Sequence, residues 1–268
     1  MEHAQRDVTV RMDWGLRGAE AVGADAAIAV VVDVLSFTTT LTVAVDAGAE
    51  VYPFRWKDAS ALEFAREHDA VLAVGRFEAR DAEPAGGVPR AVSLSPASLK
   101  GATGLERIVL PSPNGSALAH ALASGGATVV GAALRNRSAV ARWIADMLAA
   151  AAVPDPANGA RLPAVAVVAA GERWPDGSLR PAVEDLWGAG AVIAALSELG
   201  IGDQSPESWT AEAAFRGVEE SLAAELADCA SGQELATAGF GEDVAIAAEL
   251  DSSNCVPVLI GERFLNAG

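Results

Sequence analysis

Seven consecutive apolar residues, from Ala26 to Val32, place the strongest constraint on the fold of this chain. The run is rich in valine and has no alternating polar positions, so both faces of the strand that it predicts must be buried. It ends at Asp33, and residues 38–47 then predict a helix that closes at Gly48. A strand buried on both faces, then a polar turn and a helix, is typical of a sheet covered by helices.

The same unit of strand, polar turn and helix recurs along the chain. Further strands are predicted at 51–54, 71–74, 107–110, 128–131, 164–169 and 256–260. Helices are predicted at 59–67, 116–123, 135–151 and 181–199, and from Ser205-Pro206 onward. We therefore predict an α/β protein with three layers, α/β/α, around a parallel or mixed sheet.

The proline-rich segment 153–163 predicts a linker or a surface loop. It divides the chain into an N-terminal α/β half, residues 1–152, and a C-terminal α/β half, residues 164–268. Two related halves that share an active-site cleft are one form that this pattern can take. A single compact unit is the other.

Charge and apolar content narrow the classes of partner. The chain has 36 acidic and 19 basic residues, a net charge of −17, which disfavours binding to nucleic acid or to an anionic membrane surface. The longest apolar run is too short to span a bilayer, and the first residues are charged and lack the apolar core of a signal peptide. We expect a soluble, cytoplasmic protein. Cys229 and Cys255 form no redox or metal motif, so we expect reduced thiols without a catalytic role.

Polar turns follow several of the predicted strands, at the place where helix N-termini offer N–H groups to ligands. After the first run, the carboxylate of Asp33 precedes the hydroxyls of Ser36 and Thr38. Such a turn suits a hard cation or an anion. Equally, Ser36 or Thr38 caps the following helix while Asp33 complements its dipole. The residues alone leave both readings open.

The second turn combines a tight Asn-Gly pair with hydroxyl and amide groups that could cradle an oxyanion, although an ordinary turn has the same residues. The candidate substrate-binding residues here are Ser112, Asn114, Gly115 and Ser116, with Arg135 and Asn136 after the next strand. The lysine and the glycine spacing of a Walker loop are absent.

The third turn is the richest in charge. Its candidates are Gly171, Glu172, Arg173, Arg180, Glu184 and Asp185. Carboxylates gathered at strand ends make an oxygen-rich site for Mg²⁺, and two arginines can clamp a phosphate. A polar loop with an acidic first helical turn is the alternative. A fourth polar turn, 251–257, precedes the last predicted strand.

Taken in order, these four turns resemble the 2-phosphosulfolactate phosphatase family. The motifs are DVLSFTTT followed by Gly48-Ala49, PSPNGS, AAGERW with RPAVEDLWGAG, and DSSNCVP. The resemblance runs from about Trp14 to the C-terminus and implies an α/β/α phosphatase that depends on Mg²⁺. By position it implies that Asp33, Asn114, Gly115, Glu184, Asp185 and Asp251 belong to the site. We assign catalytic roles to Asp33, Glu184 and Asp185, and Mg²⁺ binding to Asp33, Asp185 and Asp251.

The implied substrate is a small anionic phosphate monoester, 2-phosphosulfolactate or a related phospho-hydroxy acid. Attack by water and an aspartyl-phosphate route through Asp33 both remain open. We expect no nucleic-acid or membrane partner, and a homodimer is possible. A catalytically degenerate member that binds an anionic metabolite and an interaction module are the alternative functions.

The sequence departs from the family pattern at three places. Ser36 and Phe37 stand where the family tends to have Arg-Ala, Gly75-Arg76 stands where it tends to have Gly-Glu, with Glu78 two residues on, and Gly188 or Ala189 stands near an expected cysteine.

The missing arginine is the most consequential departure. Serine cannot supply the cation that a substrate with both phosphate and sulfonate needs, so we expect 2-phosphosulfolactate to be a poor substrate. The competing expectation is that Arg76, Arg173 or Arg180 replaces the lost charge.

Overall fold

One mixed sheet runs through the protein. The computed structural model describes residues 3–55, 59–81, 92–100, 104–155 and 159–268. Within these ranges, nine strands form one sheet in the order β1-β9-β2-β6-β12-β13-β3-β5-β4. They are β1 (Val10–Trp14), β2 (Ile28–Val32), β3 (Glu50–Phe54), β4 (Val71–Leu72), β5 (Arg107–Pro111), β6 (Thr128–Ala132), β9 (Val165–Ala169), β12 (Pro257–Ile260) and β13 (Arg263–Asn266).

Two parallel groups make up this sheet. Strands β1, β9, β2 and β6 are parallel to one another, as are β3, β5 and β4. The antiparallel hairpin β12–β13 joins the groups, because β12 pairs antiparallel with β6 and β13 with β3. Each junction is narrow, with a single residue pair in register: Val258 with Val130, and Phe264 with Val51.

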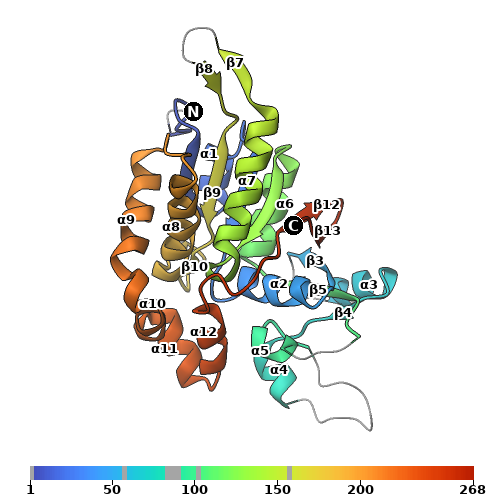
Figure 1. Cartoon of the computed structure of the whole chain (residues 1–268). Coiled ribbons are helices and arrows are strands. Elements are labelled where there is room, and N and C mark those ends of the chain that lie inside the picture. The colour runs from blue at the N-terminus through green and yellow to red at the C-terminus, as the bar shows by residue number, and fades with distance from the viewer. Residues whose placement is uncertain (1–2, 56–58, 82–91, 101–103, 156–158) are drawn as a thin grey trace.

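Helices cover both faces of the sheet, as Figure 1 shows. The helices are α1 (Gly15–Val22), α2 (Phe37–Asp46), α3 (Ala59–Glu67), α4 (Arg76–Asp81), α5 (Pro96–Leu99), α6 (Gly115–Ser124), α7 (Arg137–Ala151), α8 (Val183–Glu198), α9 (Pro206–Val218), α10 (Leu222–Asp228), α11 (Ala230–Thr237) and α12 (Gly241–Ala247), with 3₁₀ turns η1 (Leu134–Asn136) and η2 (Glu219–Ser221). The predicted α/β class with a mixed sheet and three layers is therefore confirmed.

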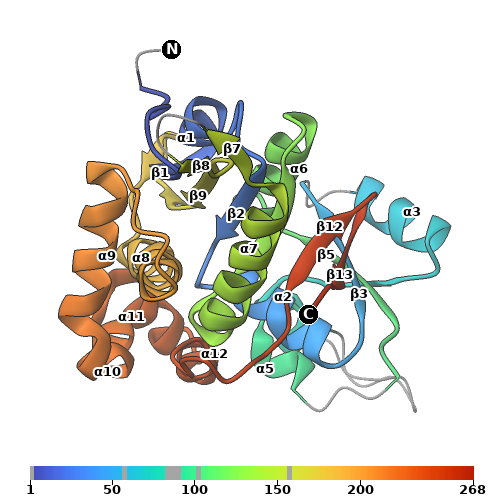
Figure 2. The same cartoon turned by 45° about the horizontal axis from the view of Figure 1, so that its top comes forward.

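Strand β2 explains why its sequence is apolar throughout. Val30 and Val32 belong to the core beneath α7, α8 and α9, whereas Ala29 and Val31 belong to a second core beneath α1, α2 and α6. Successive side chains of a strand point to opposite faces, so a strand between two helical layers needs apolar residues at every position. Figure 2, seen from a rotated view, shows α7, α8 and α9 together over the end of the sheet that holds β1, β9 and β2.

The strands of the two predicted halves are interleaved. Strand β9 follows the proline-rich segment, yet it lies between β1 and β2. The hairpin β12–β13, also from the C-terminal part, lies between β6 and β3. Residues 1–152 and 164–268 therefore contribute to one sheet instead of forming two.

Two small hairpins lie outside the main sheet. The proline-rich segment forms the antiparallel pair β7 (Val153–Asp155) and β8 (Gly159–Arg161), which projects from the top of the protein in Figure 1; residues 156–158 of the segment lie outside the described residues. The pair β10 (Glu172–Arg173) and β11 (Leu179–Arg180) follows β9 at the opposite, carboxyl end of the strand.

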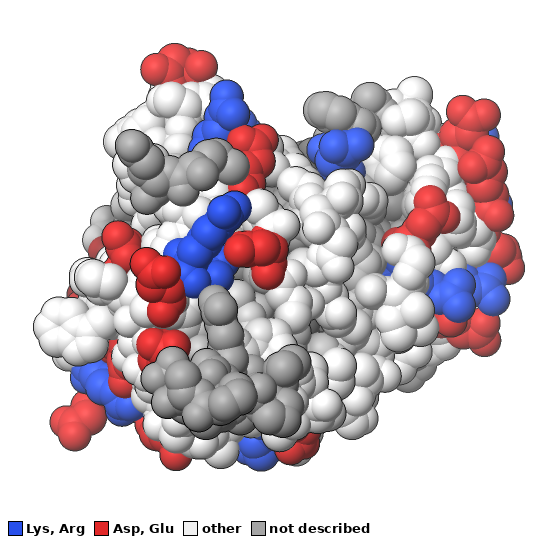
Figure 3. Space-filling model, turned by 90° about the horizontal axis from the view of Figure 1, so that it is seen from above, with Lys and Arg blue, Asp and Glu red and all other residues white. Residues whose placement is uncertain are grey.

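The surface carries both signs of charge. Figure 3 looks down on the end of the molecule that bears the β7–β8 hairpin, and acidic and basic side chains lie beside one another there. Among the described residues, Arg6 and Arg11 both pair with Asp25, at 3.5 and 2.5 Å. No helix of the described chain is long and apolar enough to cross a membrane.

Candidate active site

The first polar turn places Asp33 directly beyond the carboxyl end of β2. The carboxylate is 7% exposed, and both of its oxygens accept backbone hydrogen bonds. The N–H of Phe37 donates to Oδ1 at 3.1 Å, and the N–H of Gly115 donates to Oδ2 at 2.9 Å. Asp33 therefore joins the N-termini of α2 and α6, which follow strands of the two different parallel groups.

Only glycine fits at position 115. A Cβ atom there would lie 2.3 Å from Phe37 Cδ1 and 2.8 Å from Asp33 Oδ2, closer than atoms can approach. The Asn-Gly pair of the second turn thus allows α6 to begin against the Asp33 carboxylate.

Asp185 forms the matching connection on the other side. It lies in the first turn of α8 and is 4% exposed. Its Oδ1 accepts the N–H of Val34 at 2.7 Å, and its Oδ2 accepts the N–H of Gly171 at 2.8 Å. Because β9 lies beside β2, the turns that follow both strands reach the same carboxylate.

Close packing of α8 on β2 fixes the position of Asp185. A Cβ atom on Gly188 would lie 2.5 Å from Val34 Cγ2 and 2.7 Å from Val32 Cγ1. The glycine therefore lets α8 contact the end of β2 one helical turn after Asp185.

The turns at Asn114 and Glu172 meet at a small cavity. Asn114 Nδ2 donates to Glu172 Oε2 at 3.2 Å, and Arg173 Nε donates to Asn114 Oδ1 at 3.2 Å. All three residues line a cavity of about 180 Å³ that Trp14 and Leu179 help to enclose. Arg173 is exposed, so the cavity combines an accessible cation with a half-buried carboxylate.

Glu184 completes a group of four carboxylates. Its side chain is 2% exposed, and Cys229 Sγ contacts its Oε2 at 3.7 Å. We call Asp33, Glu172, Glu184 and Asp185 the carboxylate group, because their charges act on one another. Asp33 comes from the first polar turn and the other three from the third, and Asp33 and Asp185 lie 152 positions apart in the sequence.

Burial and mutual repulsion make the charged forms of Asp33, Glu172 and Asp185 unfavourable. Burial, followed by the charge of Glu172, raises the pKa of Asp33 to about 7, although the bonds from Phe37 and Gly115 oppose this. Burial, then Asp33 and Glu184, raises the pKa of Asp185 well above its ordinary value. Burial also raises the pKa of Glu172, which Arg180 partly offsets. Fully ionised, the group would therefore hold more negative charge than its surroundings compensate.

An oxygen-rich group of this kind suits a hard cation such as Mg²⁺. Among the described residues, however, no three Asp, Glu, His or Cys side chains already surround one point as metal ligands would. Mg²⁺ commonly binds through one or two carboxylates, with water and substrate phosphate completing its shell. The chemistry of the donors and their uncompensated charge therefore fit Mg²⁺ without a preformed protein cage.

Several predicted residues hold the turns in place. Thr38 is fully buried and exchanges hydrogen bonds with the backbone of Asp33, accepting at 3.0 Å and donating at 2.8 Å. Ser116 donates to the carbonyl of Leu110 at 3.0 Å, and Ser112 Oγ accepts a second bond from Gly115 N at 3.2 Å. These hydroxyls shape the two turns around the carboxylate.

Two further candidates lie at the edges of the carboxylate group. Arg180 Nη2 donates to Ser231 Oγ at 3.1 Å while its charge acts on Glu172. Ser36 precedes Phe37 in the first turn and accepts a hydrogen bond from Arg76.

Three predicted residues instead form a separate polar cluster at the end of β6. Arg135 pairs with Glu249, and the side chain of Asn136 bonds the backbone at Ala133, Gly131 and Cys255. The Asp251 carboxylate accepts from Arg137 Nε and from Ser138 N, both at 3.0 Å. Asp251 thus caps α7 and pairs with an arginine. The described contacts of these three residues include no member of the carboxylate group.

Other groups at the site could not be predicted from the sequence. The N–H groups of Val34 and Gly171 come from backbone, which carries no residue signature. Cys229 lies closer to the site than its sequence position indicates. Burial and the nearby Glu184 raise the pKa of its thiol to about 11, and burial raises that of Cys255 to about 12.

The fold and this geometry define an α/β protein with a polar site beyond the carboxyl ends of its strands, the usual place of active sites in such sheets. A family model described as 2-phosphosulpholactate phosphatase matches residues 19–262. A Thermus thermophilus protein described as a probable 2-phosphosulfolactate phosphatase is 32% identical over 237 residues, covering 87% of this chain and 88% of the relative. The chain belongs to the 2-phosphosulfolactate phosphatase family, which makes it a phosphoric monoester hydrolase.

Proposed function

We propose that this chain is a Mg²⁺-dependent phosphatase whose substrate is 2-phosphosulfolactate or a related phospho-hydroxy acid. The observation that carries the proposal is the carboxylate group, whose ionised form would lack a compensating charge and which lies beside arginines and turn amides. A buried cluster of negative charge would repel a phosphate ester. A divalent cation there reverses the sign of the field and attracts it.

Asp33 and Asp185 are the proposed ligands of Mg²⁺, with Glu184 adjacent. When bound, Mg²⁺ supplies neutralisation of the negative charge that develops on the phosphoryl oxygens. Asp251 is not among the proposed ligands, because its carboxylate pairs with the Arg137 guanidinium, which compensates its charge, and its described contacts include no member of the carboxylate group.

The remaining steps belong to residues of the cavity. Arg173 and Asn114 hold the phosphoryl oxygens, since both line the cavity and one orients the other. Glu172 lines the same cavity and has a raised pKa, so it is the carboxylate placed to accept a proton from attacking water.

Attack by water is the route that these contacts favour over an aspartyl-phosphate. Both oxygens of Asp33 accept backbone N–H groups, and the residue is almost fully buried. An N–H group donated to each oxygen weakens the carboxylate as a nucleophile, and burial restricts the approach of phosphorus, although each oxygen keeps a lone pair for a cation.

The test is whether the purified protein releases inorganic phosphate from a panel of phosphate esters. The panel contains 2-phosphosulfolactate, 2-phospholactate and phosphoglycolate, each with Mg²⁺ and with EDTA. We expect turnover of at least one ester that EDTA abolishes and Mg²⁺ restores. Full activity in EDTA would refute the metal requirement, and no phosphate from any ester would refute the proposed substrate class.

A matched pair of variants tests the assignment of ligands. Asp185→Asn removes one charge from the carboxylate group, and we expect about tenfold or weaker Mg²⁺ binding by titration calorimetry together with loss of turnover. Asp251→Asn makes the same chemical change outside the group and should leave Mg²⁺ binding intact. The reverse pattern would return Asp251 to the site and exclude Asp185.

The cytoplasmic location, the lack of a nucleic-acid partner and a homodimer stay predictions from the sequence.

A further inference from the structure

Two positions that set this sequence apart, Ser36 and Arg76, are in direct contact. Arg76 begins α4, and its Nη2 donates a hydrogen bond to Ser36 Oγ. The next residue, Phe37, donates its N–H to Asp33 Oδ1. The guanidinium therefore lies one residue away from the backbone that binds the carboxylate group.

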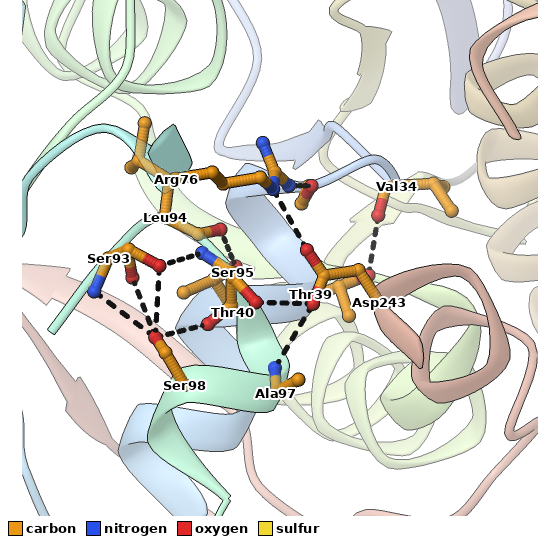
Figure 4. Close-up of polar contacts among 11 residues, drawn as sticks. Val34, Thr39, Thr40, Arg76, Ser93, Leu94, Ser95, Ala97, Ser98 and Asp243 are labelled. Atoms are coloured by element: carbon orange, nitrogen blue, oxygen red, sulfur yellow. Dashed lines mark hydrogen bonds and ion pairs between the residues drawn. The ribbon is translucent and has the colours of Figure 1, made fainter. Parts of the chain in front are cut away.

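A buried carboxylate from a distant helix orients this arginine. Asp243 in α12 is 1% exposed, and its Oδ2 accepts from Arg76 Nε at 2.8 Å. Its Oδ1 accepts from Ser95 Oγ and from the N–H of Ala97 at 3.3 Å, so α5 also fixes it. Figure 4 shows the Arg76 side chain reaching Asp243, which Ser95 and Ala97 also contact.

The guanidinium keeps the capacity to bind an anion. The two bonds described use Nε and one Nη2 donor of the five N–H donors that arginine has. The side chain is 18% exposed, so solvent reaches it. The planar guanidinium of Arg76, held along one edge by these two bonds, is already oriented for a bidentate contact with a carboxylate or a sulfonate.

Asp33 separates this arginine from the one at the cavity. Its Oδ2 bonds to Gly115, beside Asn114 and Arg173, whereas its Oδ1 bonds to Phe37, beside Ser36 and Arg76. A substrate with two acidic groups can thus place its phosphate toward Arg173 and its second anion toward Arg76.

We infer that Arg76, positioned by Asp243, binds the second acidic group of the substrate and sets the preference for esters that carry one. The inference rests on the proposed function. It adopts the alternative that an arginine from elsewhere in the chain replaces the cation that Ser36 lacks. The competing explanation is purely structural: Arg76 neutralises Asp243 and holds α4 and α5 against α12.

Three esters, each differing from the one before by a single group, distinguish these explanations. Isopropyl phosphate carries no second anion, 2-phospholactate replaces one methyl by a carboxylate, and 2-phosphosulfolactate adds a sulfonate. We expect Arg76→Gln to lower kcat/KM by about tenfold or more for esters that carry the bound group, and by less than about threefold for isopropyl phosphate. The step at which the loss begins identifies the carboxylate or the sulfonate. An equal loss for all three esters overturns the inference.

Two variants control for the buried charge of Asp243. The double variant Arg76→Gln, Asp243→Asn removes both charges, so a defect caused by an unpaired carboxylate should disappear in it. We expect the substrate-selective loss to persist, and recovery to the activity of the unmodified protein would overturn the proposal. Arg173→Ala should instead weaken turnover of all three esters similarly, because Arg173 is placed at the phosphate.

A binding measurement keeps the inference testable if the proposed hydrolysis fails. Sulfolactate and lactate, which carry the acidic groups without the phosphate, are titrated calorimetrically into the unmodified protein and into Arg76→Gln. We expect about tenfold weaker binding of at least one of them in the variant, with binding of inorganic phosphate unchanged. Unchanged binding of both acids refutes the role of Arg76, whatever the outcome for catalysis.

Discussion

Replacing Gly188 by alanine tests how α8 positions Asp185. The added Cβ would lie 2.5 Å from Val34 Cγ2 and 2.7 Å from Val32 Cγ1, and both valines are fully buried. β-Branched side chains in a packed core have little freedom to move aside, and such overpacking costs about 1–3 kcal/mol. Alanine gains about 1 kcal/mol over glycine in a helix, so the net loss of unfolding free energy should be about 1 kcal/mol.

The loss should be accompanied by a catalytic defect. If α8 moves away from β2, the 2.7 Å bond from Val34 N to Asp185 Oδ1 lengthens, and the carboxylate group loses its geometry. Thermal unfolding should show Tm lower by about 2–4 °C, and phosphate release should fall.

Gly217 provides the matched control for this experiment. It lies within α9 and has no atom within 4 Å of the place that a Cβ would occupy. Gly217→Ala should therefore raise the unfolding free energy by up to about 1 kcal/mol through helix propensity alone. If Gly188→Ala stabilises the protein as Gly217→Ala does, the close packing of α8 on β2 is refuted.

The other predictions concern the thiols, an ion-paired glutamate and a second glycine. The double variant Cys229→Ala, Cys255→Ala should keep kcat/KM within about threefold, because burial holds both thiols protonated at neutral pH; loss of activity in a folded double variant would contradict this. Burial alone would raise the pKa of Glu212, but hydrogen bonds from Gln204, Arg216 and Ser197 lower it overall. Because its folded-state pKa is lowered, ionised Glu212 stabilises the fold above the ordinary pKa of 4.5, and this stabilisation is lost as pH falls through the folded-state pKa. Glu212→Gln should therefore lower the unfolding free energy in urea by about 1 kcal/mol at pH 7 and by progressively less below pH 4.5. A difference that stays constant with pH would exclude this linkage. Gly190→Ala should destabilise more than Gly188→Ala, because its Cβ would meet the backbone oxygen of Ala211 at 1.9 Å; equal melting temperatures would show that α8 and α9 separate easily.

Local sequence predicted the elements around the site well. The apolar run before Asp33 gave β2, since burial between two helical layers leaves no polar position in the strand. The predicted helix at 59–67 coincides with α3, and Ser205 caps α9 by accepting from Ser208 N. These features depend on neighbours within a few residues, which the sequence displays directly.

The order of the strands could not be predicted in this way. The insertion of β9 between β1 and β2 depends on contacts between residues more than 130 positions apart, such as Val165 with Ile28. The hairpin β12–β13 likewise joins two parallel groups that the alternation of strands and helices does not distinguish. Strand pairing depends on the whole chain. The periodicity of apolar residues along the sequence therefore limits the possible pairings but does not determine them.

The site residues likewise divide into those that the sequence predicted and those that only the structure reveals. The carboxylates Asp33, Glu184 and Asp185 were candidates from their types and places, and the structure brings them together. Asp243 lies in no recognisable motif, and its role follows only from its contacts with Arg76 and Ser95. Asp251 had a suitable type and motif, but its carboxylate pairs with Arg137 and caps α7, away from the carboxylate group.

The carboxylate group has a structural task that constrains its chemistry. Asp33 and Asp185 each accept two backbone N–H groups, and each joins turns that follow different strands. An amide at either position offers one acceptor oxygen where two donors arrive, so the uncharged residue relieves repulsion but leaves a buried N–H unpaired. Repulsion between these carboxylates therefore persists in the folded protein, because the same carboxylates hold its turns together. A cation that binds there compensates charge that the turns themselves require, and we expect Mg²⁺ to raise Tm in the intact protein more than in Asp185→Asn.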